Sequence, residues 1–354
     1  MSQYNRVESP KVFVDNLAFS LASGWRDLDD FTIVKTSDGT TVPTLTTGVK
    51  ANLFDLKPHD PVGFSFLTQQ FTIVYDTGLG TDNYAESNFL AILGHNFHDA
   101  DCVFKVEISD ASDFSSGVTT VSTTGNHTKV INATADSNSN YIDPANNGWT
   151  LITWANQTSG NRYLRITLED DSGSSGNFNE NLFIGSLMYG ESISLGNASM
   201  NVQTSVIYDG TTLSQSTGGA TFANTKYFGQ PVWSGATTLP WNTVTTTNQH
   251  TYGFKQRYGR LKHNLNFEYL TDTNLWSKNM HGHSDPTDWE DSETLHSNFF
   301  QKTMGQHLPF LMSINGESTS EGDYSMYRIG QNGFSATQVA HRLWSYNLEL
   351  IESW

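Results

Sequence analysis

The end of the chain carries the pattern that most constrains the fold. Within residues 342–354, large apolar side chains recur at every second position: Trp344, Tyr346, Leu348 and Leu350. A period of two places alternate side chains on opposite faces of an extended strand, so one face here is aromatic and aliphatic. The pattern predicts a half-buried β-strand that ties the end of the chain into a core.

The composition favours β-structure along the whole chain. Of 354 residues, 36% are hydrophobic and only 16% are charged, which disfavours surface helices rich in Glu and Lys. Between residues 10 and 195, short runs of high β-propensity are separated by Gly, Pro or Asp-Gly, with no convincing helix between them. We therefore predict a mainly β protein that begins with a β-sandwich.

The length and a change of pattern predict two domains. A chain of 354 residues exceeds the roughly 100 to 200 residues of one ordinary domain. The first series of short β-rich runs ends near Gly196 and a second series follows, so we predict domains at residues 1–195 and 196–354. In the second block, residues 260–270 alternate cleanly as a strand, and residues 288–304 suit one short helix with an acidic start. The polar residues 119–147 are interpreted as a surface excursion with weak strands.

Charge and terminal sequence limit the classes of partner. The formal net charge is −17, from 19 basic and 36 acidic residues, which disfavours nucleic acid because its binding normally begins with a basic footprint. No apolar stretch approaches the roughly 18 to 20 residues that span a bilayer, and the N-terminus lacks a secretory leader pattern. We expect no membrane insertion and synthesis in a cytoplasm. The single cysteine, Cys102, lies in an apolar run and is expected to be a buried thiol.

Two groups of segments resemble known families. Residues 88–97, 162–168 and 182–190 resemble the core strands of galactose-binding-like (discoidin-like) jelly-roll domains found in tailed-bacteriophage virion proteins. The second block has a Gly218-Gly219 turn, an aromatic and basic segment at residues 252–260, the strand that follows it, and the terminal strand. This block is similar to the β-sandwich or barrel-like domains of phage distal tail and minor tail proteins.

The resemblance implies a structural virion protein without enzymatic activity. It implies a ring-forming distal-tail or tail-tip component that links the tail tube to peripheral parts, with copies of itself and tube or hub proteins as partners. Copies in a ring meet head to tail, and Trp, Tyr and Arg are enriched at protein interfaces. The candidate interface residues are therefore Trp233, Trp241, Arg257, Arg260 and Trp276. Ordinary packing inside the fold is the alternative for each of them.

Carbohydrate recognition is the alternative function. Sugar faces stack on exposed aromatic rings, and Tyr141 and Trp149 lie near polar loops of the first block. They are candidate contacts for a host glycan, and filling the core is the alternative role. A glycan-cleaving enzyme is a third hypothesis, since the separation of a catalytic pair of carboxylates is set by the fold, and abundant Asp and Glu alone are no evidence for such a pair.

Metal binding has weak candidates, and no cofactor is expected. His281, His283 and Asp285 lie in an acidic segment that offers several ligand types, but His-x-His beside acidic residues in such a loop is more often solvated. Residues 169–180 contain oxygen donors and glycines as calcium loops do, yet they depart from the EF-hand order of ligands. A turn between strands is the alternative to a calcium site there.

Overall fold

The computed structural model describes most of the chain. The described residues are 9–36, 39–58, 60–78, 87–135, 140–145, 148–156, 162–173, 176–196, 202–208, 211–225, 260–276 and 294–353.

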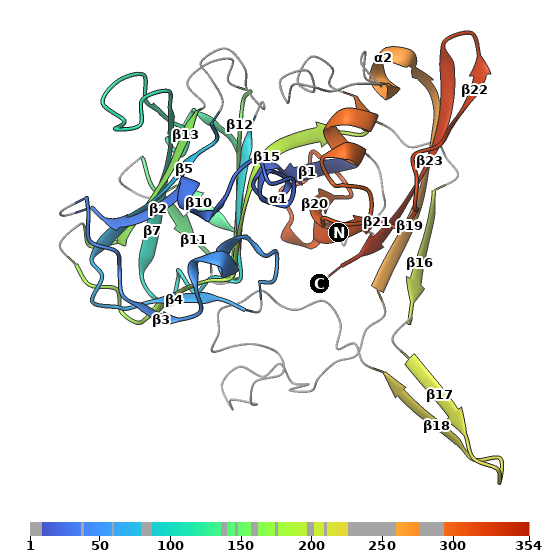
Figure 1. Ribbon diagram of the computed structural model, residues 1–354, viewed down its shortest axis with the longest axis horizontal. Helices are drawn as coiled ribbons and strands as arrows, with labels where there is room; N and C mark the ends of the chain where they lie inside the picture. Colours follow the sequence, from blue (N-terminus) through green and yellow to red (C-terminus); the bar gives the residue numbers. More distant parts are fainter. Residues whose placement is uncertain are drawn as a thin grey trace.

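The first block forms a two-layer antiparallel sandwich (Figure 1). One layer contains, in spatial order, β9 (His127–Ile131), β12 (Trp149–Trp154), β6 (Phe89–Leu93), β15 (Ser186–Ser194) and β1 (Lys11–Asp15). The facing layer runs β10 (Ala133–Ala135), β11 (Ile142–Pro144), β7 (Cys102–Ser109), β13 (Tyr163–Asp170), β5 (Gln70–Asp76) and β2 (Phe31–Lys35), with β8 (Thr119–Thr120) paired to β7.

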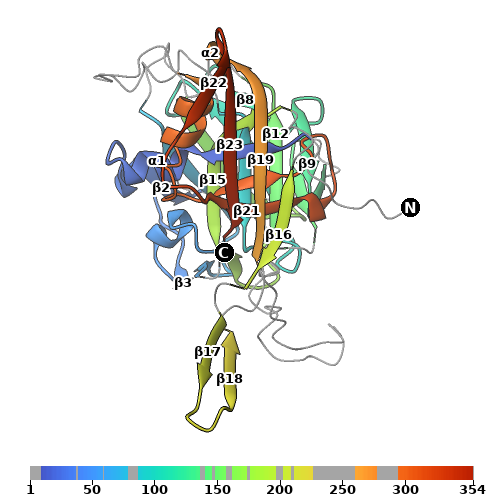
Figure 2. The same ribbon diagram turned by 90° about the vertical axis from the view of Figure 1, so that its right-hand side faces the viewer.

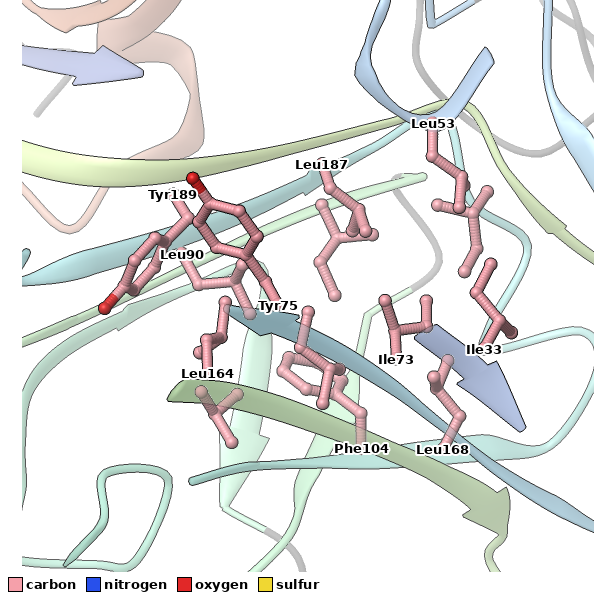
Figure 3. Packing of buried hydrophobic residues seen from close by; sticks show 14 of the residues in the cluster. Ile33, Leu53, Ile73, Tyr75, Leu90, Phe104, Leu164, Leu168, Leu187 and Tyr189 are labelled. Carbon is pink, nitrogen blue, oxygen red and sulfur yellow. The ribbon is translucent and has the colours of Figure 1, made fainter. Parts of the chain in front are cut away.

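Apolar side chains from both layers meet in the core of the sandwich. Figure 3 shows Leu90 and Leu187 from one layer facing Ile73, Phe104 and Leu164 from the other. Nearly every position of the central strands β6, β7, β12 and β13 is buried, as expected for strands covered on both faces. The predicted mainly β class with a leading sandwich is confirmed.

The second block continues the first layer as one sheet. Beyond β1 come β20 (Phe310–Ser313), β21 (Tyr324–Ile329), β23 (Leu343–Glu352), β19 (Arg260–Thr271) and the edge strand β16 (Gln203–Ile207). A further strand, β22 (Ala336–Ala340), pairs with β23. The seam is the antiparallel pair β1–β20, in which Phe13 lies opposite Leu311. Strands of both predicted domains therefore share one sheet, and the boundary after residue 195 stays a prediction.

Two further apolar clusters lie on the two faces of this long sheet. The first lies beneath the π-helix η4 (Leu295–Gln301), whose Phe299 packs against Phe310 at a ring-centroid distance of 4.9 Å. In the second, Trp149 of β12 meets Tyr324 of β21 at 5.8 Å between ring centroids. Because strands far apart in the sheet order meet there, the sheet curls around this second cluster.

The remaining elements are short. A three-stranded sheet runs β14 (Leu182–Ile184), β4 (Val62–Phe64) and β3 (Leu45–Thr47), and β17 (Thr211–Gln215) pairs with β18 (Thr221–Thr225). The helices are α1 (Asn16–Ala22), α2 (Asp272–Leu275), η1 (Leu28–Asp30), η2 (Lys50–Phe54) and η5 (Glu321–Asp323). Within the described residues, no helix has the length and apolar character needed to cross a membrane.

The sequence patterns of the second block are largely reproduced. The alternating face of β23 is buried from Tyr346 to Leu350, and in β19 the side chains of His263, Leu265 and Phe267 are buried. The predicted helix is present from Leu295, with Thr294 as its N-cap, while residues 288–293 lie outside the described residues. The polar excursion contains the predicted weak strands, since β8 to β11 all fall within it.

Candidate assembly surface

The β17–β18 hairpin, residues 211–225, projects from the body of the molecule and is called the arm below. Figures 1 and 2 show it extending away from the long sheet, just after the edge strand β16. Its strands pair from Thr211 opposite Thr225 to Gln215 opposite Thr221. Gly219 adopts a φ of +84° in the connecting turn, a conformation that glycine adopts without a steric penalty. The Gly218-Gly219 turn of the sequence is therefore the tip of the arm.

The arm exposes large apolar side chains to solvent. Every described side chain from Thr212 to Ala223 is exposed, including Leu213 at 70% and Phe222 at 62%. The register pairs Leu213 with Ala223 and Ser214 with Phe222, so the two apolar side chains lie on opposite faces of the hairpin. An isolated two-stranded hairpin is marginally stable in water, and solvated leucine and phenylalanine do not stabilise it. The arm therefore presents a large apolar side chain to solvent on each of its two faces.

A second set of exposed apolar side chains lies around β3 and β4, and we call it the β3–β4 patch. It consists of Val42, Leu45, Val49, Phe66 and Leu67. The two chain segments run antiparallel, with Leu45 opposite Phe64, and the pairing continues through a bond of 3.0 Å from Ser65 N to Thr44 O. The side chains that follow β4 thus lie beside those that precede β3. The patch and the arm are different surfaces of one chain.

Arg260 lies where the chain of β16 leaves the long sheet. It begins β19 opposite Ile207, the last residue of β16, and its Nη1 donates to the Glu352 carbonyl oxygen at 3.4 Å. The Glu352 carboxylate accepts from Leu261 N at 2.9 Å and from Ser325 Oγ at 2.8 Å. Burial raises the pKa of Glu352 and lowers that of Arg260. Arg260 is thus half-buried beside the base of the arm, and its contact with a partner stays a prediction.

Trp276 belongs to an aromatic cluster at the end of α2. Its ring contacts Phe334 at 5.1 Å, His296 at 5.6 Å and Trp344 at 5.7 Å between ring centroids. The Trp344 indole N–H donates to Asp272, the first residue of α2. This half-buried cluster holds α2 on the sheet, and an interface role for Trp276 stays a prediction.

Most of the other predicted site residues lie outside the described residues. These are the interface candidates Trp233, Trp241 and Arg257 and the metal candidates His281, His283 and Asp285. Within the described residues, no group of three or more His, Cys, Asp or Glu side chains gathers to hold a metal ion. In the segment 169–180, which had suggested a calcium site, Asp170 Oδ1 accepts from the Ser172 backbone N–H at 2.9 Å. This carboxylate therefore stabilises a turn.

The two predicted glycan contacts are buried side chains of the first block. Trp149 is 7% exposed. In the orientation of the Asn132 amide in which its nitrogen donates to Glu321, its oxygen accepts from the Trp149 indole N–H at 2.6 Å. Tyr141 is 8% exposed, and Lys105 Nζ lies 5.6 Å from its ring centroid. Burial, together with the Glu169 carboxylate, raises the pKa of Tyr141. Little ring surface remains free for stacking, and contact with a glycan stays a prediction for both.

His95, which follows an apolar strand as some catalytic histidines do, is a core residue. It is fully buried, with Nε2 3.1 Å from Thr150 Oγ1, and burial lowers its pKa to about 3. Its ring stacks on Phe97 at 4.3 Å. His263 is similar, lying between Thr204 Oγ1 at 2.9 Å and Tyr327 OH at 3.0 Å, with a pKa lowered to about 4 by burial. Both rings are neutral packing groups at physiological pH.

The sequence indicated only part of this surface. The sequence indicated the Gly218-Gly219 turn but not the strands on either side of it. Leu213 and Phe222 were not singled out, because a single apolar residue in a polar segment does not show whether it is buried or exposed. The β3–β4 patch was also missed, since the pairing that brings the residues after β4 close to those before β3 has no signal in the sequence.

Comparison with known proteins gives weak likenesses. No protein-family model matches the sequence, and no curated protein matches it either. Among solved structures, chitosan-binding module 1 of a chitosanase/glucanase from Paenibacillus sp. IK-5 is 14% identical, with a TM-score of 0.27, covering 47% of this chain and 99% of that chain. A selenomethionine-labelled variant of that module is 13% identical, with a TM-score of 0.26, covering 43% and 95%. A pectin-binding carbohydrate-binding module is 12% identical, with a TM-score of 0.25, covering 46% and 88%. These values are too low for the likenesses to carry an argument about this chain.

Proposed function

We propose that this protein is a non-enzymatic structural component of a tailed-phage virion that assembles head to tail into a ring at the distal tail. The observation that carries the proposal is the arm, a projecting hairpin with exposed Leu213 and Phe222. The sequence resemblance to distal tail and minor tail proteins supplies the place in the particle.

A ring requires two different and complementary surfaces on each copy. The arm is one, and the β3–β4 patch, which includes Phe66 and Leu67, is the other. Contact between copies would remove the apolar surface of these side chains from water. Each Å² that is buried stabilises the contact by roughly 25 cal/mol. Association would also order the hairpin. We therefore assign the patch of one copy as the docking site for the arm of the next.

The first test is the mass of the protein in solution, measured by light scattering, together with electron microscopy of any large species. We expect closed rings of the unchanged protein and a monomer for the double variant Leu213→Thr, Phe222→Thr. Thr221→Ser is the matched control in the same hairpin and should leave the ring intact. A monomer of the unchanged protein at high concentration would refute self-assembly.

A mixing experiment tests the head-to-tail geometry. The arm variant keeps its patch, and a Phe66→Thr, Leu67→Thr variant keeps its arm. Each alone should be monomeric, whereas the mixture should form one-to-one dimers and nothing larger, because only one intact contact is left in each pair. Rings from either variant alone would contradict the assignment. Antibody labelling of intact virions then tests the distal-tail position.

Carbohydrate recognition is the second candidate function. The observation that favours it is a cavity between the end of β15 and the helix η4, which is lined by hydroxyl and amide residues that include Ser192, Ser194 and Asn298.

A further inference from the structure

The strand β16 lies at one edge of the long sheet and lacks the features that protect most other sheet edges of the molecule (Figure 2). Because an edge strand carries unpaired N–H and C=O groups, proteins protect such edges with bulges, lysine, proline or short strands. At the opposite edge of the same sheet, β9 contains Lys129, and its pairing with β12 shifts register. The pairings of β22 and β3 also shift, β2 ends in Lys35, and β10 and β14 are short. In contrast, β16 pairs with β19 without a shift, and residues 202–208 contain no charged residue and no proline.

The same strand exposes apolar side chains on one face. Val206 is 55% exposed and Tyr208 is 57% exposed. Thr204 lies on this face, and its Oγ1 is 2.9 Å from Nδ1 of the buried His263. Val202, also on this face, packs against the apolar cluster beneath η4. The apolar face of the long sheet therefore continues to β16, where it is open to solvent.

A second copy of β16 is complementary to this edge. Around a two-fold axis at Ser205, two antiparallel copies of the strand place Val202 opposite Tyr208 of the second copy, and Thr204 opposite Val206. Cross-strand pairs of β-branched and aromatic side chains stabilise an antiparallel pair of strands. No like charges face each other within residues 202–208, although the whole chain has a net charge of −17. We infer that β16 pairs with β16 of a second copy, so that the long sheet continues from one copy into the next.

This contact goes beyond the proposed function and does not depend on it, because the arm and the patch meet head to tail whereas β16 meets itself. The contact is small, since only residues 202–208 of each copy meet, and stable interfaces involve roughly 20 to 30 residues on each side. Isolated copies should therefore pair only transiently, and a variant that cannot form the ring stays a monomer in light scattering. Several copies held in one ring would present several such edges, whose contacts act together.

Disulfide trapping tests the pairing and its register. In the antiparallel pair, Ser205 of each copy lies opposite Ser205 of the other, with Cα atoms roughly 4.5 to 5.5 Å apart, a separation that a disulfide spans. Ser205→Cys is introduced into the arm variant Leu213→Thr, Phe222→Thr, which lacks the ring contact, and is oxidised with oxidised glutathione. We expect a covalent dimer on a non-reducing gel. The native Cys102 is buried and should not cross-link.

Gln203→Cys is the matched control for the register. Gln203 lies on the same face of β16 as Ser205 and is the more exposed of the two, so random collisions would favour its cross-link. In the paired strands, however, its counterpart lies four residues further along, roughly 14 Å away, which is too far for a disulfide. This variant should lose the dimer.

A charge at the edge tests whether the strands pair. Val206→Lys, combined with Ser205→Cys, should abolish the covalent dimer, because a lysine on an edge strand opposes pairing with another strand. Val339→Lys is the matched control, since Val339 of β22 is 51% exposed, and it should keep the dimer.

Two results would overturn the inference. One is the absence of a covalent dimer in Ser205→Cys, which would show that the edge does not pair. The other is an equal amount of dimer in Gln203→Cys, which would show that the cross-link reports random collision. Light scattering of the unchanged protein reports the ring separately, so failure of the β16 contact and failure of ring assembly are distinguishable.

Discussion

Asp15 is a buried carboxyl group at the junction of β1 and α1. Its Oδ1 accepts from Leu17 N at 2.9 Å as the helix N-cap and from Tyr189 N at 3.2 Å, while its Oδ2 is buried without a partner. Burial raises the pKa of Asp15 to about 7 in the folded protein, and the backbone N–H donors only partly oppose this rise. The group is therefore protonated in the folded protein at mildly acidic pH.

The raised pKa predicts a pH dependence with a definite sign. Between the unfolded value of 3.8 and about 7, folding takes up one proton at Asp15, so its contribution to stability is present at low pH and is lost as the pH rises. The free energy of unfolding should fall by about 1.4 kcal/mol per pH unit relative to Asp15→Asn, which keeps the cap acceptor but does not titrate. Urea unfolding of both proteins across this range measures the difference. If the free energies of unfolding of the two proteins change in parallel with pH, the raised pKa of Asp15 is wrong.

At the scale of the element, β19 is interrupted by a bulge. Its pairing with β23 shifts between Phe267 and Leu270, and Tyr269 lies there with a φ of +63° and 69% of its surface exposed. A strict alternation would have buried Tyr269 with Phe267, as the sequence pattern indicated. The extra residue of the bulge turns the side chain outward. This element also brings Leu270 to the wall of the polar cavity.

The backbone conformation of Tyr269 predicts a substitution that is nearly neutral for stability. A non-glycine residue in the left-handed region costs about 1 kcal/mol, and relieving this strain in Tyr269→Gly offsets the entropic cost of glycine of about 0.5 to 1 kcal/mol, so the free energy of unfolding should change little. Glu268→Gly, one residue earlier and also exposed, is the matched control and should lower stability by about 0.5 to 1 kcal/mol. Thermal unfolding of the two variants gives the comparison. Equal losses in both would mean that the bulge is not strained.

Individual strands could be predicted from the sequence where apolar and polar side chains alternate along them. The strands β19 and β23 were predicted nearly to the residue, because buried and exposed positions follow a period of two. The buried pair Glu191 and Lys302 had no local signal, since each residue reads as a surface charge. The contact of Trp149 with Tyr324 likewise had no local signal, since β12 and β21 lie far apart in the sheet order.

At the scale of the whole molecule, the β1–β20 seam joins strands of the two blocks in one sheet. Leu311 of β20 is fully buried in a cluster with Phe13 of β1, Phe89 of β6 and Met326 of β21. The sequence predicted the blocks but not this joint, because pairing between segments so distant along the chain leaves no periodic pattern. The sheet order is therefore the part of the fold that required the structure.

The shared sheet predicts coupled unfolding of the two blocks. Leu311→Ala should cost about 2 to 5 kcal/mol, and hydrogen exchange should accelerate in β6 as well as in β23. Val339→Ala on the exposed strand β22 should change neither. Unaltered protection of β6 in Leu311→Ala would indicate that the blocks unfold separately.

The place of β1 in the middle of the sheet has a consequence for synthesis on the ribosome. The strand is made well before β20, its partner on one side, which follows only at residues 310–313. For roughly tens of seconds at ordinary rates of elongation, the nascent sandwich presents an open strand edge with free N–H and C=O groups. Neighbouring chains on one messenger then carry the same unpaired edge at high local concentration. The yield of folded protein in the cell should thus depend on chaperones that shield this edge until β20 is synthesised.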